Sequence, residues 1–236
     1  MIIEQQLQHG ILNKLGIVLM KTTSCRFLFS AVAVTGMLLS GNIVAGSHFG
    51  ISTAQAQTTY TSAQLSKWLK NTGDTMVGVV NSDMSAKEKK DKFLTLLNQD
   101  VDVDIIAKFC LGRFWRTATP AQQKEYVELF HQVLINSITD RLGEYKGVSF
   151  NIGKVSKTEG NKFSIETILH RPKQPDVSIQ WIISTESGTP KVVDIIGENA
   201  SLSVTQRGDY TSFIARHGNS VSALIDALKR QIAKHP

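Results

Sequence analysis

The stretches FSIETIL (residues 163–169) and VSIQWII (residues 177–183) decide the fold of this chain. In both of them apolar side chains alternate with polar ones, which is the period of a β-strand with one buried face. Two further strands are expected at residues 148–152 and 191–196. The segments between the four strands are short and contain the turn residues Gly, Asn, Asp and Pro. The pattern therefore predicts an antiparallel meander with one polar face.

Before these strands the sequence has the pattern of helices. Residues 119–145 carry apolar side chains at steps of three and four, and they open with a capping box formed by Thr119 and Gln122. Ser85 and Glu88 form a second capping box, which predicts another helix start. Further helices are expected at residues 64–80, from about 101, at 209–216 and from 221 onward. The predicted fold class is α+β, with helices packed on one face of a four-stranded antiparallel sheet.

Residues 1–56 differ from the rest of the chain. An uncharged apolar run of thirteen residues, 27–39, follows two basic residues, and residues 54–56 read Ala-Gln-Ala. This is the pattern of a secretory signal and its cleavage site. Thirteen helical residues reach roughly 20 Å, less than the ~30 Å core of a bilayer, so a cleaved signal is favoured over an uncleaved anchor. We expect an exported protein, with an N-terminal extension and signal at 1–56 and one domain at 57–236.

Composition narrows the classes of protein to which the chain can belong. Its 236 residues include 26 basic and 20 acidic side chains, for a net charge of +6, and 42% of the residues are hydrophobic. These values are those of a globular protein and exclude collagen-like, low-complexity and disordered chains. The charged stretch 87–92 is of mixed sign and no RNA-binding motif accompanies it, so it is interpreted as a solvated helix face and no nucleic-acid partner is expected.

No catalytic or metal-binding motif is found in the sequence. The four histidines after residue 56 lie apart from one another and from Cys110, and metalloprotease, redox, hydrolase and P-loop motifs are missing. Cys110 lies in the apolar stretch 105–111, where a buried, inert thiol is favoured over a nucleophile. We therefore expect no enzymatic activity, no catalytic residue, no metal site and no cofactor. From the residues alone, the apolar surface of both layers fits a packed core.

Two segments carry a resemblance to a known family. The first is LGRFWRTATPAQQ (residues 111–123), and the second is VDIIGENASL (residues 193–202). Both are similar to segments of the MlaC-like family, the periplasmic lipid carriers of the Mla (toluene-tolerance) ABC transport system. The resemblance covers roughly residues 60–234. The family usually has Gly and Val where this chain has Asn199 and Ala200, which puts the turn after the last strand in question.

The resemblance implies an apolar pocket between helices and sheet. There a diacyl phospholipid would be bound as cargo, with its tails inside and its head group near the mouth. It also implies handover in the periplasm between an outer-membrane lipoprotein and the inner-membrane ring subunit of an ABC transporter. We expect a monomer. The segment 205–207 is closer to a branch found beside hopanoid-synthesis genes, so another apolar lipid such as a hopanoid is an alternative cargo. Two competing hypotheses are a non-carrier adaptor of the transporter and a periplasmic enzyme.

Eight apolar residues are the candidates for the lipid-binding pocket. Strand alternation places alternate residues of neighbouring strands on one face of the sheet, and residues one helical turn apart can oppose that face across a gap. The predicted lipid-binding residues are Phe130, Leu134, Phe150, Phe163, Ile165, Ile179, Trp181 and Ile195. The alternative interpretation is that the same residues interdigitate as an ordinary packed core.

Overall fold

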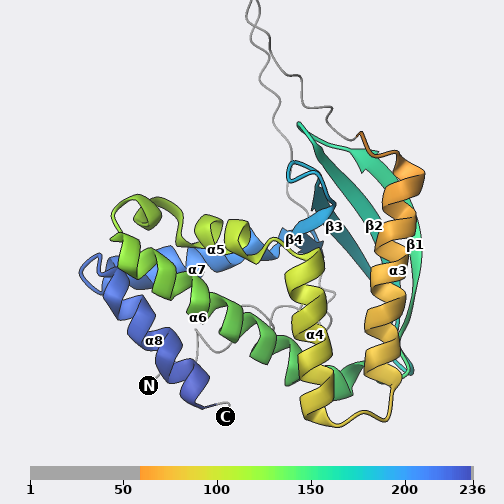
Figure 1. Cartoon of the computed structure of the whole chain (residues 1–236), viewed down its shortest axis with the longest axis horizontal. Helices are drawn as coiled ribbons and strands as arrows, with labels where there is room; N and C mark the ends of the chain where they lie inside the picture. Colours follow the sequence, from red (N-terminus) through yellow and green to blue (C-terminus); the bar gives the residue numbers. More distant parts are fainter. Residues whose placement is uncertain (1–58, 235–236) are drawn as a thin grey trace, which may run out of the picture.

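The structure, a computed structural model, describes residues 59–234, so the predicted signal and its cleavage site lie outside the described residues. The α-helices of this part are α3 (Ser62–Asn81), α4 (Ala86–Asp100), α5 (Val103–Leu111), α6 (Pro120–Thr139), α7 (Leu202–Arg216) and α8 (Val221–Ala233) (Figure 1). Two 3-10 helices are η1 (Gly112–Arg116) and η2 (Leu142–Tyr145). The strands are β1 (Ser149–Lys157), β2 (Lys162–His170), β3 (Val177–Ser184), β4 (Lys191–Gly197) and β5 (Ala200–Ser201). The predicted α+β class is confirmed.

The strands form one antiparallel sheet in the order β1-β2-β3-β4-β5, so each strand pairs with the next along the chain. In the register, Ile165 lies opposite Trp181, and Trp181 lies opposite Ile195. Because residues opposite each other share a face, these three side chains lie on one side of the sheet. The meander is therefore as predicted, with its apolar face formed by alternate residues.

The predicted strand count of four is wrong, because a fifth strand of two residues follows β4. Glu198 and Asn199 link the two strands with φ angles of 47° and 63°, which makes a two-residue hairpin turn in the left-handed region. Asn adopts this region more readily than most residues. Asn199 therefore suits the turn that it occupies.

The two predicted capping boxes are present. The Thr119 hydroxyl accepts a hydrogen bond from the Gln122 amide at 3.2 Å, and Ser85 accepts one from Glu88 at 3.3 Å. The helix predicted over 119–145 is wrong at its far end, since α6 ends at Thr139 and the chain turns into η2. Its apolar pattern continues through η2 because that short helix still packs against the core.

The helix predicted at residues 209–216 begins earlier, at Leu202. Ser201 caps α7 by accepting from the Val204 amide at 3.0 Å, and it donates to the Asp194 carboxylate at 2.6 Å. Asp194 also accepts from the Ser203 amide at 3.1 Å. The cap is therefore the local Ser201 hydroxyl, which also donates to a carboxylate of β4.

The helices lie in two groups on one face of the sheet. In Figure 1, α3 stands in front of the strands, α4 stands next to α3, and α5 to α8 gather on the other side of α4. The larger core cluster contains residues of all six helices from α3 to α8. A smaller cluster joins Leu65 and Leu69 of α3 to the inner face of the sheet. None of the helices in residues 59–234 is both long enough and apolar enough to cross a membrane.

Candidate functional site

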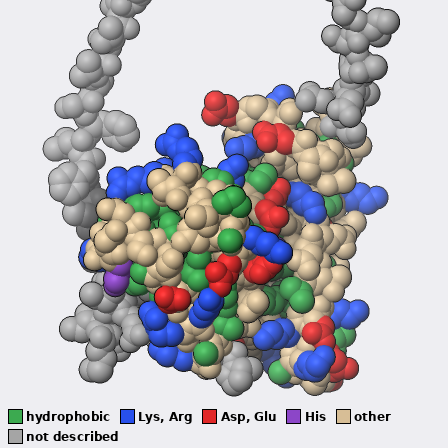
Figure 2. Space-filling view, turned by 60° about the vertical axis from the view of Figure 1, so that its left-hand side comes forward, with side chains coloured by type: hydrophobic (Ala, Val, Ile, Leu, Met, Phe, Trp, Pro, Cys, Tyr) green, Lys and Arg blue, Asp and Glu red, His purple; other side chains and the backbone are tan. Residues whose placement is uncertain are grey.

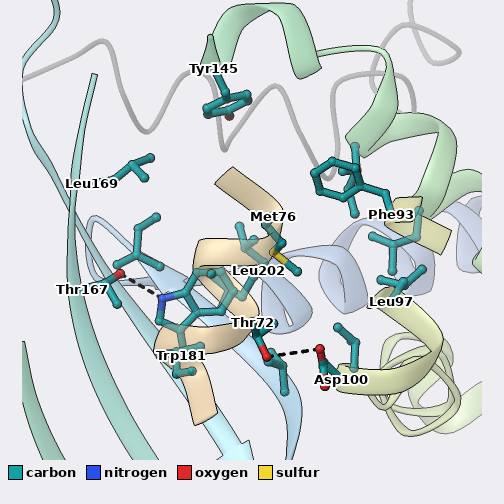
Figure 3. A pocket seen from close by; sticks show the side chains of 18 of the residues that line it. Thr72, Met76, Phe93, Leu97, Asp100, Tyr145, Thr167, Leu169, Trp181 and Leu202 are labelled. Carbon is teal, nitrogen blue, oxygen red and sulfur yellow. Dashed lines mark hydrogen bonds between the residues drawn. The ribbon is translucent and has the colours of Figure 1, made fainter. Parts of the chain in front are cut away.

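A cavity of about 320 Å³ lies between the inner face of the sheet and helices α3, α4 and α6. Most of its wall is apolar. Helices and η2 contribute Leu69, Met76, Phe93, Leu97, Phe130, Leu134, Ile138 and Tyr145, and the strands contribute Phe150, Leu169, Ile179, Trp181, Val192 and Ile195. A concave apolar site of this size is typical of small-molecule binding. Figure 3 shows several of these side chains facing a common space.

Helix α3 shapes one wall of the cavity through its spacing and one glycine. Leu69, Thr72 and Met76 follow one another at three- and four-residue steps, so they share the face turned toward the sheet. A Cβ atom on Gly73 would lie 2.3 Å from Cζ of Phe150. The missing side chain therefore allows the Phe150 ring of β1 to pack directly against the helix and to line the cavity.

Two pairs of polar groups in the wall are hydrogen-bonded to each other. The Trp181 indole donates to the Thr167 hydroxyl at 2.9 Å, and the Thr72 hydroxyl donates to the Asp100 carboxyl at 3.2 Å (Figure 3). Burial raises the pKa of Asp100, whose side chain is 3% exposed, against the opposing effects of Thr72, Lys191 and Trp68. Paired in this way, these groups leave the surrounding surface suited to an apolar ligand.

Arg141 brings a positive charge to the wall of the cavity. Tyr145 also belongs to the wall, and in Figure 3 it lies well apart from the Thr72–Asp100 pair. Burial raises the pKa of Tyr145, with a further contribution from Glu144, while Arg141 and Arg171 act in the opposite direction.

Six of the eight residues predicted for the pocket line the cavity. They are Phe130, Leu134, Phe150, Ile179, Trp181 and Ile195. The structure places the other two, Phe163 and Ile165, outside it, in the core cluster with Leu65 and Leu69. Their side chains point to the same side of the sheet as Ile179, Trp181 and Ile195. Leu65 and Leu69 of α3 fill the space above them.

Sequence reasoning missed the residues that α3 and α4 contribute to the wall. Met76 and Leu97 occupy ordinary positions on the apolar faces of their helices, so nothing in the spacing separates them from core residues. Gly73 was the available signal, because a glycine inside a helical pattern often marks a close approach of another element.

Cys110 lies in the core, as predicted, and outside the cavity wall. It is completely buried, and its thiol donates to the Ser203 carbonyl oxygen at 3.6 Å. Burial, with a smaller effect of Asp194, raises the pKa of Cys110 to about 12, so the thiol stays protonated at neutral pH. Across residues 59–234, no three His, Cys, Asp or Glu side chains gather to hold a metal ion.

The surface over α5 to α8 shows charges of both signs. In Figure 2, which brings the left-hand side of Figure 1 forward, basic and acidic side chains are interspersed with small apolar areas. A nucleic-acid site would need a continuous basic stripe, which this face does not present.

The chain is similar to known proteins in both sequence and fold. The chain is 23% identical over 140 residues to the toluene tolerance protein ttg2D of Pseudomonas putida, a match that covers 59% of this chain and 65% of that protein. The chain thus spans slightly less than two thirds of the length of this relative. The fold is also that of a phospholipid-binding protein from Ralstonia solanacearum solved in complex with a phospholipid, with a TM-score of 0.63 at 20% identity. That likeness covers 74% of this chain and 98% of the Ralstonia chain.

The profile of the MlaC protein family matches residues 70–230, which is more than half of the chain. Both segments that carried the resemblance, 111–123 and 193–202, fall inside the match. In the structure the second of them contains the Glu198–Asn199 hairpin, and it contains Ser201, the N-cap of α7, together with its partner Asp194. This chain therefore belongs to the MlaC family.

Proposed function

We propose that this chain is a periplasmic carrier that binds a phospholipid by its acyl tails. In this proposal the carrier exchanges the lipid with an outer-membrane lipoprotein and with the inner-membrane ring of an ABC transporter. The observation that carries the proposal is the apolar cavity of about 320 Å³, whose walls come from both the helices and the sheet. Membership of the MlaC family and the phospholipid-binding Ralstonia protein of the same fold support it.

The physical argument concerns where acyl chains can leave water. Burial of each CH₂ group gains about 0.8 kcal/mol, so release of a diacyl lipid into water is very slow. A carrier must therefore replace the membrane interior with its own apolar surface. Transfer then requires contact between the carrier and a membrane component, because a free lipid would have to cross the aqueous phase.

The polar groups of the wall support binding rather than catalysis. Thr72 and Asp100 pair with each other, as do Thr167 and Trp181, and the thiol of Cys110 is held protonated in the core. Nucleophilic catalysis needs an activated nucleophile beside a base, and these side chains are arranged differently. The bound phospholipid is cargo in this proposal, and the carrier acts as a monomer.

Native mass spectrometry of the purified chain tests the proposal. We expect a bound species with the mass of a phospholipid, and we expect Ile179→Trp to lose it because the larger side chain fills the cavity. Ile165→Trp is the matched control: it adds the same bulk to the neighbouring strand, in the core and outside the cavity. Overpacking of that kind typically costs about 1–3 kcal/mol, so the control should melt earlier but keep its lipid while folded.

Two results would contradict the proposal. Protein that binds no lipid when offered phospholipid vesicles after delipidation would favour an adaptor with an unused cavity. A bound mass that matches a neutral polycyclic lipid would favour a hopanoid cargo. Exchange with membranes is tested separately by following a labelled phospholipid from the loaded carrier to purified transporter in vesicles, with vesicles that lack the transporter as control.

A further inference from the structure

Three large apolar side chains are exposed on the outer surface of α5 and α7. Ile105 is 50% exposed, Phe109 38% and Val204 57%. Ile105 and Phe109 lie four residues apart on α5, so they share one face of that helix. The thiol of Cys110 donates to the Ser203 carbonyl oxygen at 3.6 Å, which places α7 directly beside the exposed end of α5 (Figure 1). Exposed apolar side chains that gather on one surface often mark an interaction site, whereas scattered ones do not.

Basic side chains lie beside these apolar residues and over aromatic rings. Cζ of Arg207 lies 5.0 Å from the centre of the Phe109 ring, and Nζ of Lys108 lies 5.7 Å from the centre of the Trp115 ring. Arg207 is also three residues from Val204, on the same face of α7. The apolar stems of both cations therefore cover aromatic surface, while their charged ends stay in water next to the exposed side chains.

The 3-10 helix η1 brings a third cation to this surface. A Cβ atom on Gly112 would lie 3.1 Å from Nε of Arg207, so the arginine of α7 reaches the backbone at the point where α5 ends. Arg113 is the next residue, it is exposed, and its Cζ atom lies 4.9 Å from the centre of the Phe114 ring. We refer to Ile105, Lys108, Phe109, Arg113, Val204 and Arg207 as the α5–α7 patch.

The three cations of the α5–α7 patch form no ion pair with a carboxylate within residues 59–234. Two carboxylates lie in the first turn of α5, and both have partners there. Asp102 is the N-cap of the helix, and Asp104 lies 2.8 Å from Nε2 of His131. Asp209 is two residues from Arg207 and therefore points to the other side of α7. The patch thus presents positive charge together with apolar surface.

We propose that the α5–α7 patch docks onto a lipid bilayer that carries anionic head groups. In this arrangement the apolar side chains enter the boundary between head groups and acyl chains, and the basic side chains contact the lipid phosphates. The core of a protein–protein interface is depleted in Lys and in charged residues generally. Because cations lie directly beside its apolar side chains, the patch suits a bilayer surface better than a protein partner.

The α5–α7 patch lies on the outside of segments that line the cavity. Ile106 and Leu202 belong to the cavity wall, and they lie one and two residues from the exposed Ile105 and Val204. Docking at the patch therefore brings this part of the wall close to the bilayer. The inference goes beyond the proposed function, since docking uses the outer surface of the two helices and does not depend on the cargo.

Flotation with vesicles tests the inference. The purified chain is mixed with vesicles of phosphatidylcholine, prepared with or without phosphatidylglycerol, and the protein that floats with them is measured. We expect the chain to float with the anionic vesicles only. High salt should release it, because the Debye length falls from about 10 Å at 0.1 M to about 3 Å at 1 M. Exchange of cargo alone leaves the protein in solution, so flotation reports docking.

Two double variants separate the charged part of the patch from the apolar part. Lys108→Gln with Arg113→Gln should bind anionic vesicles about 25-fold more weakly, which is about fivefold for each basic side chain. Ile105→Ser with Val204→Ser should bind them about tenfold more weakly, because the inserted apolar surface is lost.

The matched controls lie on α4, where basic and acidic side chains are mixed. Lys87→Gln with Lys92→Gln removes the same charge as the basic double variant, and Leu94→Ser removes an apolar side chain that is 38% exposed. Lys87 already pairs with Asp91 at 2.8 Å. We expect both controls to float like the natural chain.

Each outcome bears on the inference. A natural chain that stays in solution, or that floats equally well without phosphatidylglycerol, overturns it. Patch variants that float like the natural chain place the membrane contact elsewhere and also overturn it. Patch variants that float normally but no longer pass a labelled phospholipid to the purified transporter would assign the patch to a protein partner.

Lipid occupancy separates the inference from the proposed function. Both patch variants should keep their bound phospholipid in native mass spectrometry, because none of the substituted residues lines the cavity. A natural chain that floats but holds no lipid would contradict lipid carriage and leave docking intact. Should a double variant fail to fold, Ile105→Ser and Arg113→Gln are measured singly, and unchanged flotation of both contradicts the inference.

Discussion

One face of the sheet has two regions. In the solid region other side chains pack directly against it, and the hollow region borders the cavity. In the solid region Phe163, Ile165 and Ile183 pack under the first half of α3, and in the hollow region Ile179 and Trp181 face the cavity. The two regions meet where Ile165 lies opposite Trp181. Both are built mainly from large apolar side chains at alternate positions, so the sheet itself does not distinguish them.

The difference lies in what the opposing helix offers. The first half of α3 presents Leu65 and Leu69, which fill the space above the solid region. The second half presents Gly73 and Met76 at the cavity wall, while α4 and α6 close the space from farther away. Whether an apolar strand becomes core or binding surface therefore depends on the element above it.

Truncation of one isoleucine in each region tests whether the two regions differ in how tightly they are packed. We expect Ile165→Ala to lower the free energy of unfolding of delipidated protein by about 2–5 kcal/mol, because it opens a void in close packing. Ile179→Ala should lower it by clearly less, since that side chain already borders empty space. Urea unfolding of both variants measures the difference. Equal losses would mean that the wall packs as tightly as the core.

An added methyl group on α3 should test how closely the helix approaches β1. Gly73→Ala would force the Phe150 ring toward the cavity, which we expect to reduce lipid occupancy. Overpacking typically costs about 1–3 kcal/mol, of which the better helix propensity of Ala offsets about 1 kcal/mol. Gly78→Ala is the matched control on the same helix: nothing lies within 4 Å of its added Cβ, so it should stabilise the protein and leave occupancy unchanged. Similar effects of the two changes would rule out the proposed steric cause.

Thiol chemistry should sharpen the distinction between core and cavity. Cys110 is fully buried and its pKa is raised to about 12, so we expect no reaction with an apolar maleimide until the protein unfolds. A thiol placed in the wall by Ile179→Cys should react in delipidated protein and be protected by lipid. Cys110→Ala should reduce stability by about 1 kcal/mol, close to the value of one buried methylene group, without affecting lipid occupancy. Rapid labelling of Cys110 in folded protein would show that the core is open.

The smallest effect concerns the pH dependence of stability. Burial raises the pKa of Asp100 above its ordinary value, so folding favours the protonated carboxyl. As the pH rises from the unfolded pKa through the folded one, the natural chain should lose the stability that protonation gives it, and it should remain at the lower value above that window. Asp100→Asn cannot titrate, so its stability relative to the natural chain should increase across the same window. Melting temperatures of both proteins from pH 3 to pH 8 measure this. Parallel curves would contradict the assigned burial of the charge.

The sequence predicted those parts of the fold that depend on local pattern. The capping boxes at Ser85 and Thr119 and the alternation in β2 and β3 are local, and each appears where expected. The start of α7 was missed because residues 203–209 carry a single apolar side chain and so show no helical period, although Ser201 is a typical N-cap residue. The short β5 was missed because two residues are too few to show a period.

The candidate site was predicted only in part, for a related reason. Period-two alternation identifies the face to which a side chain points, and this was sufficient to find Ile179, Trp181 and Ile195. The same period gives no information about the opposing layer, so Phe163 and Ile165 could not be separated from them. A dense core and a cavity wall have the same hydrophobic pattern, and only the tertiary packing of α3 distinguishes them.

The order of the strands has a consequence for how the chain reaches its folded state. Every strand pairs with its neighbour in the chain, so each pairing closes a loop of modest length. Closure of short loops carries a small entropic penalty, and contacts between near neighbours in sequence favour rapid folding. The meander can therefore assemble without a lipid to act as a template. In the proposed function, the protein would therefore fold before it acquires its first lipid.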